Sequence, residues 1–135
     1  MSKYDHLKLK IVDSEFKYVL LKNKEDLTEL VVKSSDLPIA LFSGDGEVSA
    51  IVPSNIECDS VKAETEWICL RIIGEMPFGT VQGLIAEISG ILANHGMGIC
   101  VVSTFLTDWF FVKAKNKDRA ISDLKTAGWK FAENE

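Results

Sequence analysis

A chain of 135 residues and 15.0 kDa has room for one ordinary domain or two very small ones. A content of 47% hydrophobic and 26% charged residues is typical of a globular protein and excludes a largely disordered chain. The formal net charge of −5 argues against binding to nucleic acid or to an anionic membrane surface, because neutralising phosphates requires a cationic face.

The first half of the chain predicts two strands, a helix and a strand pair. Residues 7–11 alternate between apolar and charged side chains, which is typical of a half-buried strand. Glycines in the turn at residues 43–46 favour a hairpin. The predicted elements are strands at 7–11 and 15–22, a helix at 24–33, and strands at 39–42 and 48–52. The polar residues 56–64 are expected to connect the two halves.

The second half predicts strand, helix, strand, strand, helix and a short last strand. Residues 67–73 are almost continuously apolar, as in a central strand. Thr80 can cap a helix that runs to about Asn94. One face of this helix carries apolar side chains at i, i+3, i+4, i+7 and i+11, namely Val81, Leu84, Ile85, Ile88 and Leu92. The remaining predicted elements are strands at 99–104 and 109–115, a helix between Asn116 and Gly128, and a strand at 129–131.

This order predicts an α+β fold of the ferredoxin-like, βαββαβ type, with two helices on one face of an antiparallel sheet. The first half follows a shortened version of the same order. We therefore divide the chain into a degenerate N-terminal domain at residues 1–62 and a C-terminal domain at residues 63–135. The division rests on element order alone, because the two halves share no repeat of residues.

The sequence offers little for catalysis or for a cofactor. Two histidines, His6 and His95, and no Cys-x-x-Cys spacing give no reason to expect a metal site. There is no nucleophile elbow and no phosphate-binding loop. Cys69 and Cys100 lie within apolar strands and are expected to fill the core. We therefore expect no catalytic residue, no cofactor and no metal.

The start of the second-half helix offers a binding geometry instead. Backbone N–H groups at Gly83, Leu84 and Ile85 can receive a carboxylate, assisted by the helix dipole. Phe78, in the preceding loop, would shape the approach. Asp108, placed in a turn before the next strand, can pair with an ammonium group, although aspartate is also favoured in turns for backbone reasons alone. One anion site beside one cation site suits a free α-amino acid.

Several segments of the chain resemble the ACT domain family. In the second half these are residues 67–74, 83–93 and 96–99, followed by Ser-Thr-Phe-Leu-Thr-Asp at 103–108, which is the most specific. In the first half, residues 41–43, 47–49 and 52–53 are similar to its strand-turn-strand segment. More narrowly, the chain resembles tandem ACT proteins, a subgroup that includes the cytosolic arginine sensors of animals and small bacterial two-ACT proteins.

The resemblance implies two ACT domains side by side, the first degenerate, with an amino acid bound at an ACT–ACT interface. It adds Thr104 and Phe105 to the ligand contacts and gives Asp108 the α-amino group. The arginine sensors carry an acidic residue just before the helix, where this chain has Val81 and Gln82. The expected ligand therefore has an apolar or uncharged side chain.

We accordingly expect a non-catalytic regulatory module that binds an amino acid, forms a homodimer and acts on an unknown downstream protein. A cytoplasmic location is expected, since the polar residues 1–6 lack a signal-peptide core and no apolar run approaches the roughly 18–20 residues of a membrane span. Three widely spaced cysteines also suit a reducing compartment. Two alternatives are a ligand-free interaction protein that uses its sheet edges to oligomerise, and a small ferredoxin-like enzyme. The lack of an acid–base pair counts against the enzyme.

Overall fold

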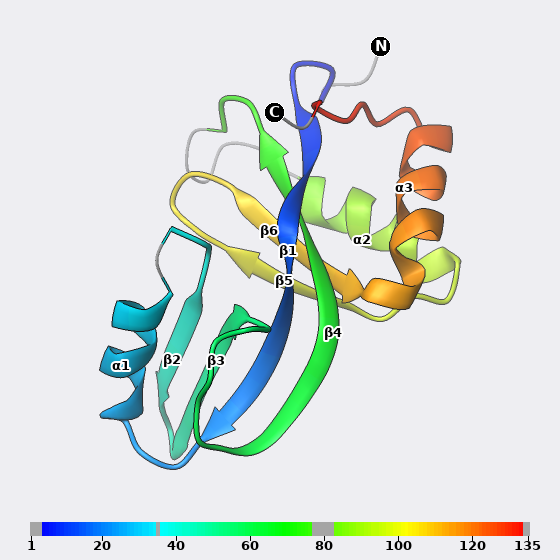
Figure 1. Cartoon of the computed structure of the whole chain (residues 1–135). Coiled ribbons are helices and arrows are strands. Elements are labelled where there is room, and N and C mark those ends of the chain that lie inside the picture. Colours follow the sequence, from blue (N-terminus) through cyan, green and yellow to red (C-terminus); the bar gives the residue numbers. More distant parts are fainter. Residues whose placement is uncertain (1–3, 35, 77–82, 134–135) are drawn as a thin grey trace. The chain divides into compact units, whose positions relative to one another are not determined.

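The computed structural model describes residues 4–34, 36–76 and 83–133. They fall into two compact units: a discontinuous unit, Met1–Asp13 with Ile68–Glu135, and a continuous unit, Ser14–Trp67. The strands are β1 (Lys8–Leu21), β2 (Ala40–Gly44), β3 (Glu47–Pro53), β4 (Ser60–Ile73), β5 (Ile99–Ser103) and β6 (Asp108–Lys113) (Figure 1). The helices are α1 (Asp26–Lys33), α2 (Leu84–Asn94) and α3 (Lys117–Thr126), the last preceded by a 3-10 turn at Ala114–Asn116. No helix among these residues is long and apolar enough to cross a membrane.

The discontinuous unit is a sheet with strands in the order β5-β6-β4-β1, covered on one face by α2 and α3 (Figure 1). Strands β5 and β6 are antiparallel, with Ile99 opposite Val112 and Ser103 opposite Asp108. Apolar residues at every second strand position and every fourth position of α2 form its core, as these periods require. The core includes Leu9, Leu70, Ile72, Phe110 and Val112 from strands, and Leu84, Ile88, Leu92 and Leu124 from helices.

Both helices of this unit end in the same hydrogen-bonded motif around a glycine. Gly96 has a φ of 79° and donates its N–H to the Ala93 carbonyl at 2.9 Å. Gly128, with a φ of 103°, donates to Lys125 in the same way, and the next residue, Trp129, donates to Leu124 at 2.9 Å. These are Schellman motifs, in which a left-handed glycine closes the helix. The predicted helix ends, at about Asn94 and before Gly128, are confirmed.

The continuous unit has the strand order β2-β3-β1-β4 and one helix, α1. Its β2–β3 hairpin turns at Asp45 and Gly46, which have φ angles of 50° and 83°. Two residues with positive φ define the type I′ turn, which suits the twist of paired strands. The predicted hairpin is therefore confirmed. The core of this unit is small and contains Val19, Leu21, Leu30, Ala50 and Val52.

Two strands are longer than the sequence predicts. β1 is one strand of 14 residues instead of separate strands at 7–11 and 15–22. β4 also has 14 residues and begins at Ser60, so the expected connector at 56–64 is wrong for its last five positions. The side chains of residues 61–66 are exposed, and β4 is the last strand in the order of the continuous unit. Edge strands are often polar, which hides them from a search for apolar runs.

The predicted last strand at 129–131 is wrong, because only a single parallel bridge between Leu9 and Phe131 forms there. In the sheet, β1 lies next to β4, and Leu9 near the start of β1 is fully buried. Gly74 allows this close approach: a Cβ there would lie 2.7 Å from the Leu7 Cδ2 atom and 3.0 Å from the His6 carbonyl oxygen. Residues 4–13 therefore pack with the C-terminal part of the chain. The compact units consequently differ from the division into 1–62 and 63–135.

The two units have the same topology. Along the chain, the discontinuous unit runs β4, α2, β5, β6, and the continuous unit runs β1, α1, β2, β3. In each unit the first of these strands lies in the sheet between the third strand and a fourth strand from another part of the chain. The fourth strand is the start of β1 in the discontinuous unit and the start of β4 in the continuous unit. The described part of the continuous unit has no second helix; at the corresponding place in its element order, Ser54 to Asp59 form a short turn and extended chain.

Candidate functional site

The start of α2 is set by Gly83, which precedes the first helical residue in the left-handed conformation with a φ of 78°. The Gly83 carbonyl accepts the first helical hydrogen bond from the Glu87 N–H at 2.9 Å. The first N–H groups of an α-helix have no acceptor within the helix, so they are suited to an anionic group. Leu84 anchors this end in the core, whereas Ile85 is 38% exposed. The predicted cap Thr80 and the candidate residue Phe78 lie outside the described residues.

The loop between β5 and β6 is held by its two threonines. The Thr104 N–H and hydroxyl both donate to the Thr107 carbonyl, at 2.9 and 3.0 Å. The Thr104 hydroxyl also accepts a 3.0 Å hydrogen bond from the Trp109 indole. The Thr107 hydroxyl donates at 2.7 Å to the carbonyl of Ile72, near the end of β4. Thr104 was expected to contact a ligand, but its hydroxyl is already hydrogen-bonded to Thr107 and Trp109.

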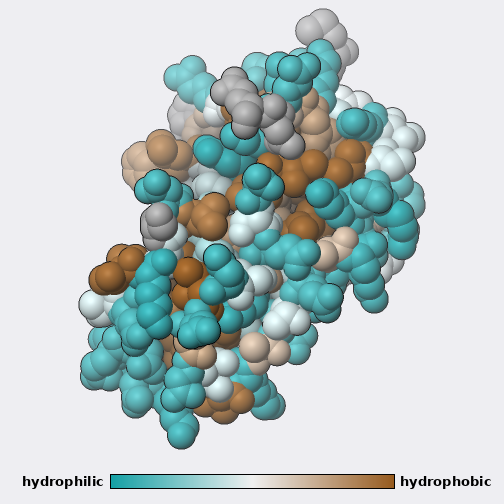
Figure 2. All heavy atoms as spheres, in the orientation of Figure 1, coloured by the Kyte–Doolittle hydropathy of each residue, from teal (hydrophilic) through white to brown (hydrophobic). Residues whose placement is uncertain are grey.

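The tip of this loop is apolar and open to solvent. Phe105 is 74% exposed and Leu106 is 73% exposed. The tip forms a hydrophobic spot on the face of the molecule that Figure 2 shows. Exposed pairs of large apolar side chains are suited to contact with a ligand or with another protein surface.

Among the candidate site residues, Asp108 has the environment that differs most from the prediction. It is the first residue of β6, paired with Ser103, and is only 8% exposed, so its placement in a turn is wrong. The strand starts early because the Thr107 side chain fastens the chain to β4 just before it. Alternation along β6 puts Asp108 on the same face as Phe110 and Val112, the face that carries the helices.

Asp108 and α2 therefore lie on the same face of the sheet. The bond from Thr107 to Ile72 places the start of β6 beside the end of β4. Gly83, Leu84, Ile85 and Asp108 all belong to the discontinuous unit. Thr104 supports the loop that leads to Asp108, and Phe105 is presented at its tip.

The opposite face of the sheet contains groups that the sequence analysis did not select as a site. The Arg71 guanidinium lies over the Trp109 ring, 4.9 Å from its centroid. Burial raises the pKa of the neighbouring Cys69 thiol to about 12, against a smaller lowering by Arg71. Such a thiol stays protonated near neutral pH and is a poor nucleophile. Cys69 is a core residue, as expected. Among the described residues, no group of three or more histidine, cysteine or acidic residues is placed to hold a metal.

Known proteins share this architecture. A family model described as the ACT domain matches residues 62–126, just under half of the chain. The matched segment is thus similar to ACT domains, a regulatory and non-catalytic class of domain with a mixed α/β fold. The matched segment contains the helix start, the β5–β6 loop and Asp108, but not the strand that the N-terminal residues supply. No curated protein sequence matches the chain.

Solved structures have a similar fold over nearly the whole chain. Protein Atu0741 from Agobacterium tumefaciens is 23% identical and superposes with a TM-score of 0.82, covering 96% of both chains. A Vibrio cholerae protein of unknown function, described as a possible transport protein, is 16% identical with a TM-score of 0.66, over 90% of this chain and 89% of that chain. The regulatory subunit of aspartate kinase from Thermus thermophilus is 10% identical with a TM-score of 0.61, over 87% of this chain and 97% of the subunit. These likenesses establish the fold.

Proposed function

We propose that this protein is a non-catalytic, cytoplasmic regulatory module that binds a free amino acid at an ACT–ACT interface and works as a homodimer. The observation that carries the proposal is the buried Asp108, on the sheet face that also carries α2. A buried carboxylate is costly without a partner. An ammonium group at Asp108 and a carboxylate at the N–H groups of Gly83, Leu84 and Ile85 account for both charges of an amino acid.

The exposed apolar residues suit the rest of the ligand. Phe105 and Ile85 offer contact to an apolar or uncharged side chain, and Phe78 is proposed to complete the approach. Thr104 is assigned to the site through the loop that it holds, since its hydroxyl both donates and accepts within the protein.

The shared topology of the two units supports a tandem arrangement. Both have the same strand order and the same sequence of strand, helix, strand and strand. The continuous unit is the degenerate copy in this proposal, because it has one helix where the discontinuous unit has two. The regulatory subunit of aspartate kinase, which has a similar fold, is consistent with a regulatory role.

The proposal is tested by calorimetric titration of the full chain with each of the twenty amino acids. We expect at least one to bind, and Asp108→Asn to weaken that binding at least tenfold, because a charge-assisted hydrogen bond contributes roughly 1.5–3 kcal/mol. Asparagine keeps the shape of the buried side chain, so the melting midpoint serves as the control for folding. Asp118→Asn, an exposed change on α3, should bind like the wild type. Equal affinity of Asp108→Asn and wild type would place the ligand elsewhere.

One observation favours a second function, an interaction protein that has lost the ligand. The exposed Phe105 and Leu106 follow β5, the edge strand of the discontinuous unit, and edge strands readily pair with another chain. This function predicts a dimer by light scattering and no heat with any amino acid. The first proposal predicts a dimer that also binds. A monomer in both the presence and the absence of amino acids would contradict both.

A further inference from the structure

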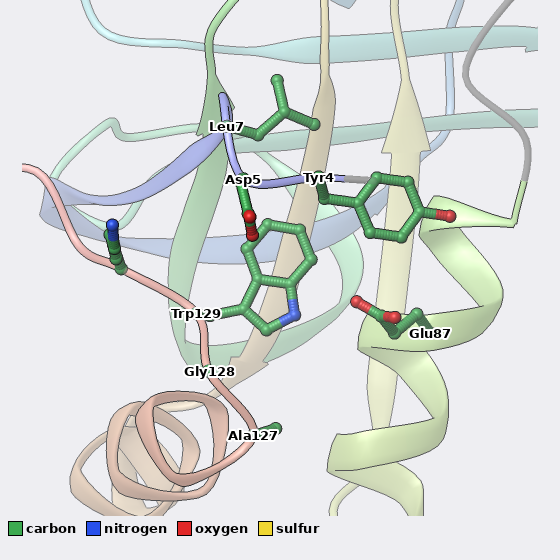
Figure 3. Close-up of a pocket in the computed structure, with 8 residues that line it drawn as sticks. Tyr4, Asp5, Leu7, Glu87, Ala127, Gly128 and Trp129 are labelled. Carbon is green, nitrogen blue, oxygen red and sulfur yellow. The ribbon is translucent and has the colours of Figure 1, made fainter. Parts of the chain in front are cut away.

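A pocket of about 320 Å³ lies within the discontinuous unit, between the N-terminal turn, α2 and the segment that follows α3 (Figure 3). None of the described residues of the proposed amino-acid site lines it. Its volume is in the lower part of the range for small-molecule sites.

Two stacked aromatic rings form a wall of the pocket. Tyr4 and Trp129 are nearly parallel, at 17°, with ring centroids 5.8 Å apart, and both are buried. Their backbones are fixed: Trp129 belongs to the glycine motif that ends α3, and the Tyr4 carbonyl accepts a 2.8 Å hydrogen bond from Leu7. The Lys130 carbonyl accepts another from Leu9, also at 2.8 Å. The aromatic wall is therefore formed before any ligand arrives.

The charges around these rings are mainly negative. Figure 3 shows the Glu87 carboxylate directed from α2 toward the two rings, and Asp5 stands on the N-terminal turn. Among the described residues that line the pocket, Lys130 is the one basic residue. All three charged side chains are exposed. Two carboxylates against one ammonium leave the described residues that line the pocket with a net charge of −1.

We propose that this pocket binds a small organic cation, an alkyl ammonium group or a guanidinium group. Aromatic faces attract cations through their quadrupole, and carboxylates at the rim add direct charge attraction. Leu7 and Ala127 offer an apolar surface to a short alkyl stem. The residues come from both ends of the chain and from α2, so the pocket requires the folded discontinuous unit.

The test is titration of the full chain with n-butylammonium, followed by NMR at the indole N–H of Trp129. The chain has three tryptophans, and a Trp129→Phe variant identifies the signal. We expect saturable shifts with n-butylammonium and at least tenfold weaker effects with the neutral n-butanol and the anion butyrate. Butanol or butyrate binding as well as the cation would overturn the proposal.

Variants that change the charge of residues at the rim of the pocket test whether the pocket prefers a positively charged ligand. Glu87→Gln and Asp5→Asn should each weaken cation binding severalfold, and together at least tenfold. Lys130→Gln should strengthen it severalfold, because it removes a like charge. Glu64→Gln, an exposed carboxylate of the continuous unit, is the matched control and should change nothing. Unchanged affinity in the Glu87 and Asp5 variants, or weaker binding in Lys130→Gln, would overturn the proposal. Asp108→Asn should leave cation binding intact, which separates this site from the proposed amino-acid site.

Discussion

Asp108 and Thr104 show how much the role of a residue depends on its hydrogen bonds. A carboxylate that is 8% exposed needs a counter-charge or donors, whereas the same side chain in an open turn needs neither. The Thr104 hydroxyl, bonded to Thr107 and Trp109, instead fixes the loop geometry. In the proposed site, Asp108 supplies charge and Thr104 supplies rigidity.

Cys69 leads to a prediction about reactivity. Its side chain is buried in β4, and burial raises its pKa to about 12. Since only the thiolate reacts readily, iodoacetamide at pH 8 should modify the partly exposed Cys58 and Cys100 and leave Cys69 unmodified. Peptide mass spectrometry after a timed reaction measures this. Comparable labelling of all three cysteines in the folded protein would contradict the prediction.

The same pKa shift predicts a loss of stability at high pH. The folded pKa of Cys69 lies above its ordinary value of 9.0, so the folded state favours the protonated thiol. This contribution is fully present below pH 9 and is lost as the pH rises from 9 through about 12. The free energy of unfolding of the wild type should therefore fall more steeply over this range than that of Cys69→Ala. Parallel slopes would show that the thiol is not responsible.

At the scale of elements, α2 offers a direct test of which face is buried. Ile88 is fully buried among core residues, whereas Ile85 on the same helix is 38% exposed. Ile88→Ala should lower the free energy of unfolding by about 2–5 kcal/mol, as other large-to-small core changes do. The matched change Ile85→Ala should cost clearly less. Denaturant unfolding of both variants decides the matter, and equal losses would mean that the helix is turned differently.

Patterns within short stretches of sequence predicted the elements that short stretches determine, such as the α2 helix and the β2–β3 turn. The helical spacing of Leu84, Ile88 and Leu92 identified the inner face of α2, and the glycine at position 46 identified the hairpin turn. The polar first half of β4 was missed because its exposed side chains carry no apolar pattern. The pairing of β1 with β4 was also missed, since it joins segments far apart in the sequence and leaves no local signal.

The candidate sites also contain features that the local sequence indicates and features that only the tertiary fold creates. Residue type and position were enough to select Asp108 and Gly83 as candidates, but the burial of Asp108 is a feature of the folded chain, in which Thr107 bonds to β4. The Tyr4–Trp129 stack brings together opposite ends of the chain. The only local indication of this stack in the sequence is Trp129, which directly follows Gly128 at the end of α3. Only the tertiary fold could show that Tyr4 lies against it.

At the scale of the whole molecule, each compact unit depends on a strand from another part of the chain. β1 divides between the units at Asp13 and Ser14, and β4 divides between them at Trp67 and Ile68. The segment that matches the ACT domain, residues 62–126, therefore lacks one strand of its own sheet. The N-terminal residues are part of the core of the discontinuous unit, since Leu7 and Leu9 are buried with Ile72 and Leu84.

This dependence predicts that a fragment of residues 62–135 folds poorly alone and is rescued by the missing strand. Burying a leucine contributes about 1.5–3 kcal/mol, so losing Leu7 and Leu9 removes an amount comparable with the roughly 5–15 kcal/mol that stabilise a whole domain. The fragment should melt well below the full chain, or without a cooperative transition, when followed by circular dichroism. Adding a peptide of residues 1–22 should restore a cooperative transition, because the peptide supplies both the apolar side chains and the backbone partners of β4. The same peptide with Leu7→Asp and Leu9→Asp keeps the backbone but cannot fill the core, so it should not rescue. A fragment that melts like the full chain without peptide would show that the N-terminal strand is dispensable to this unit.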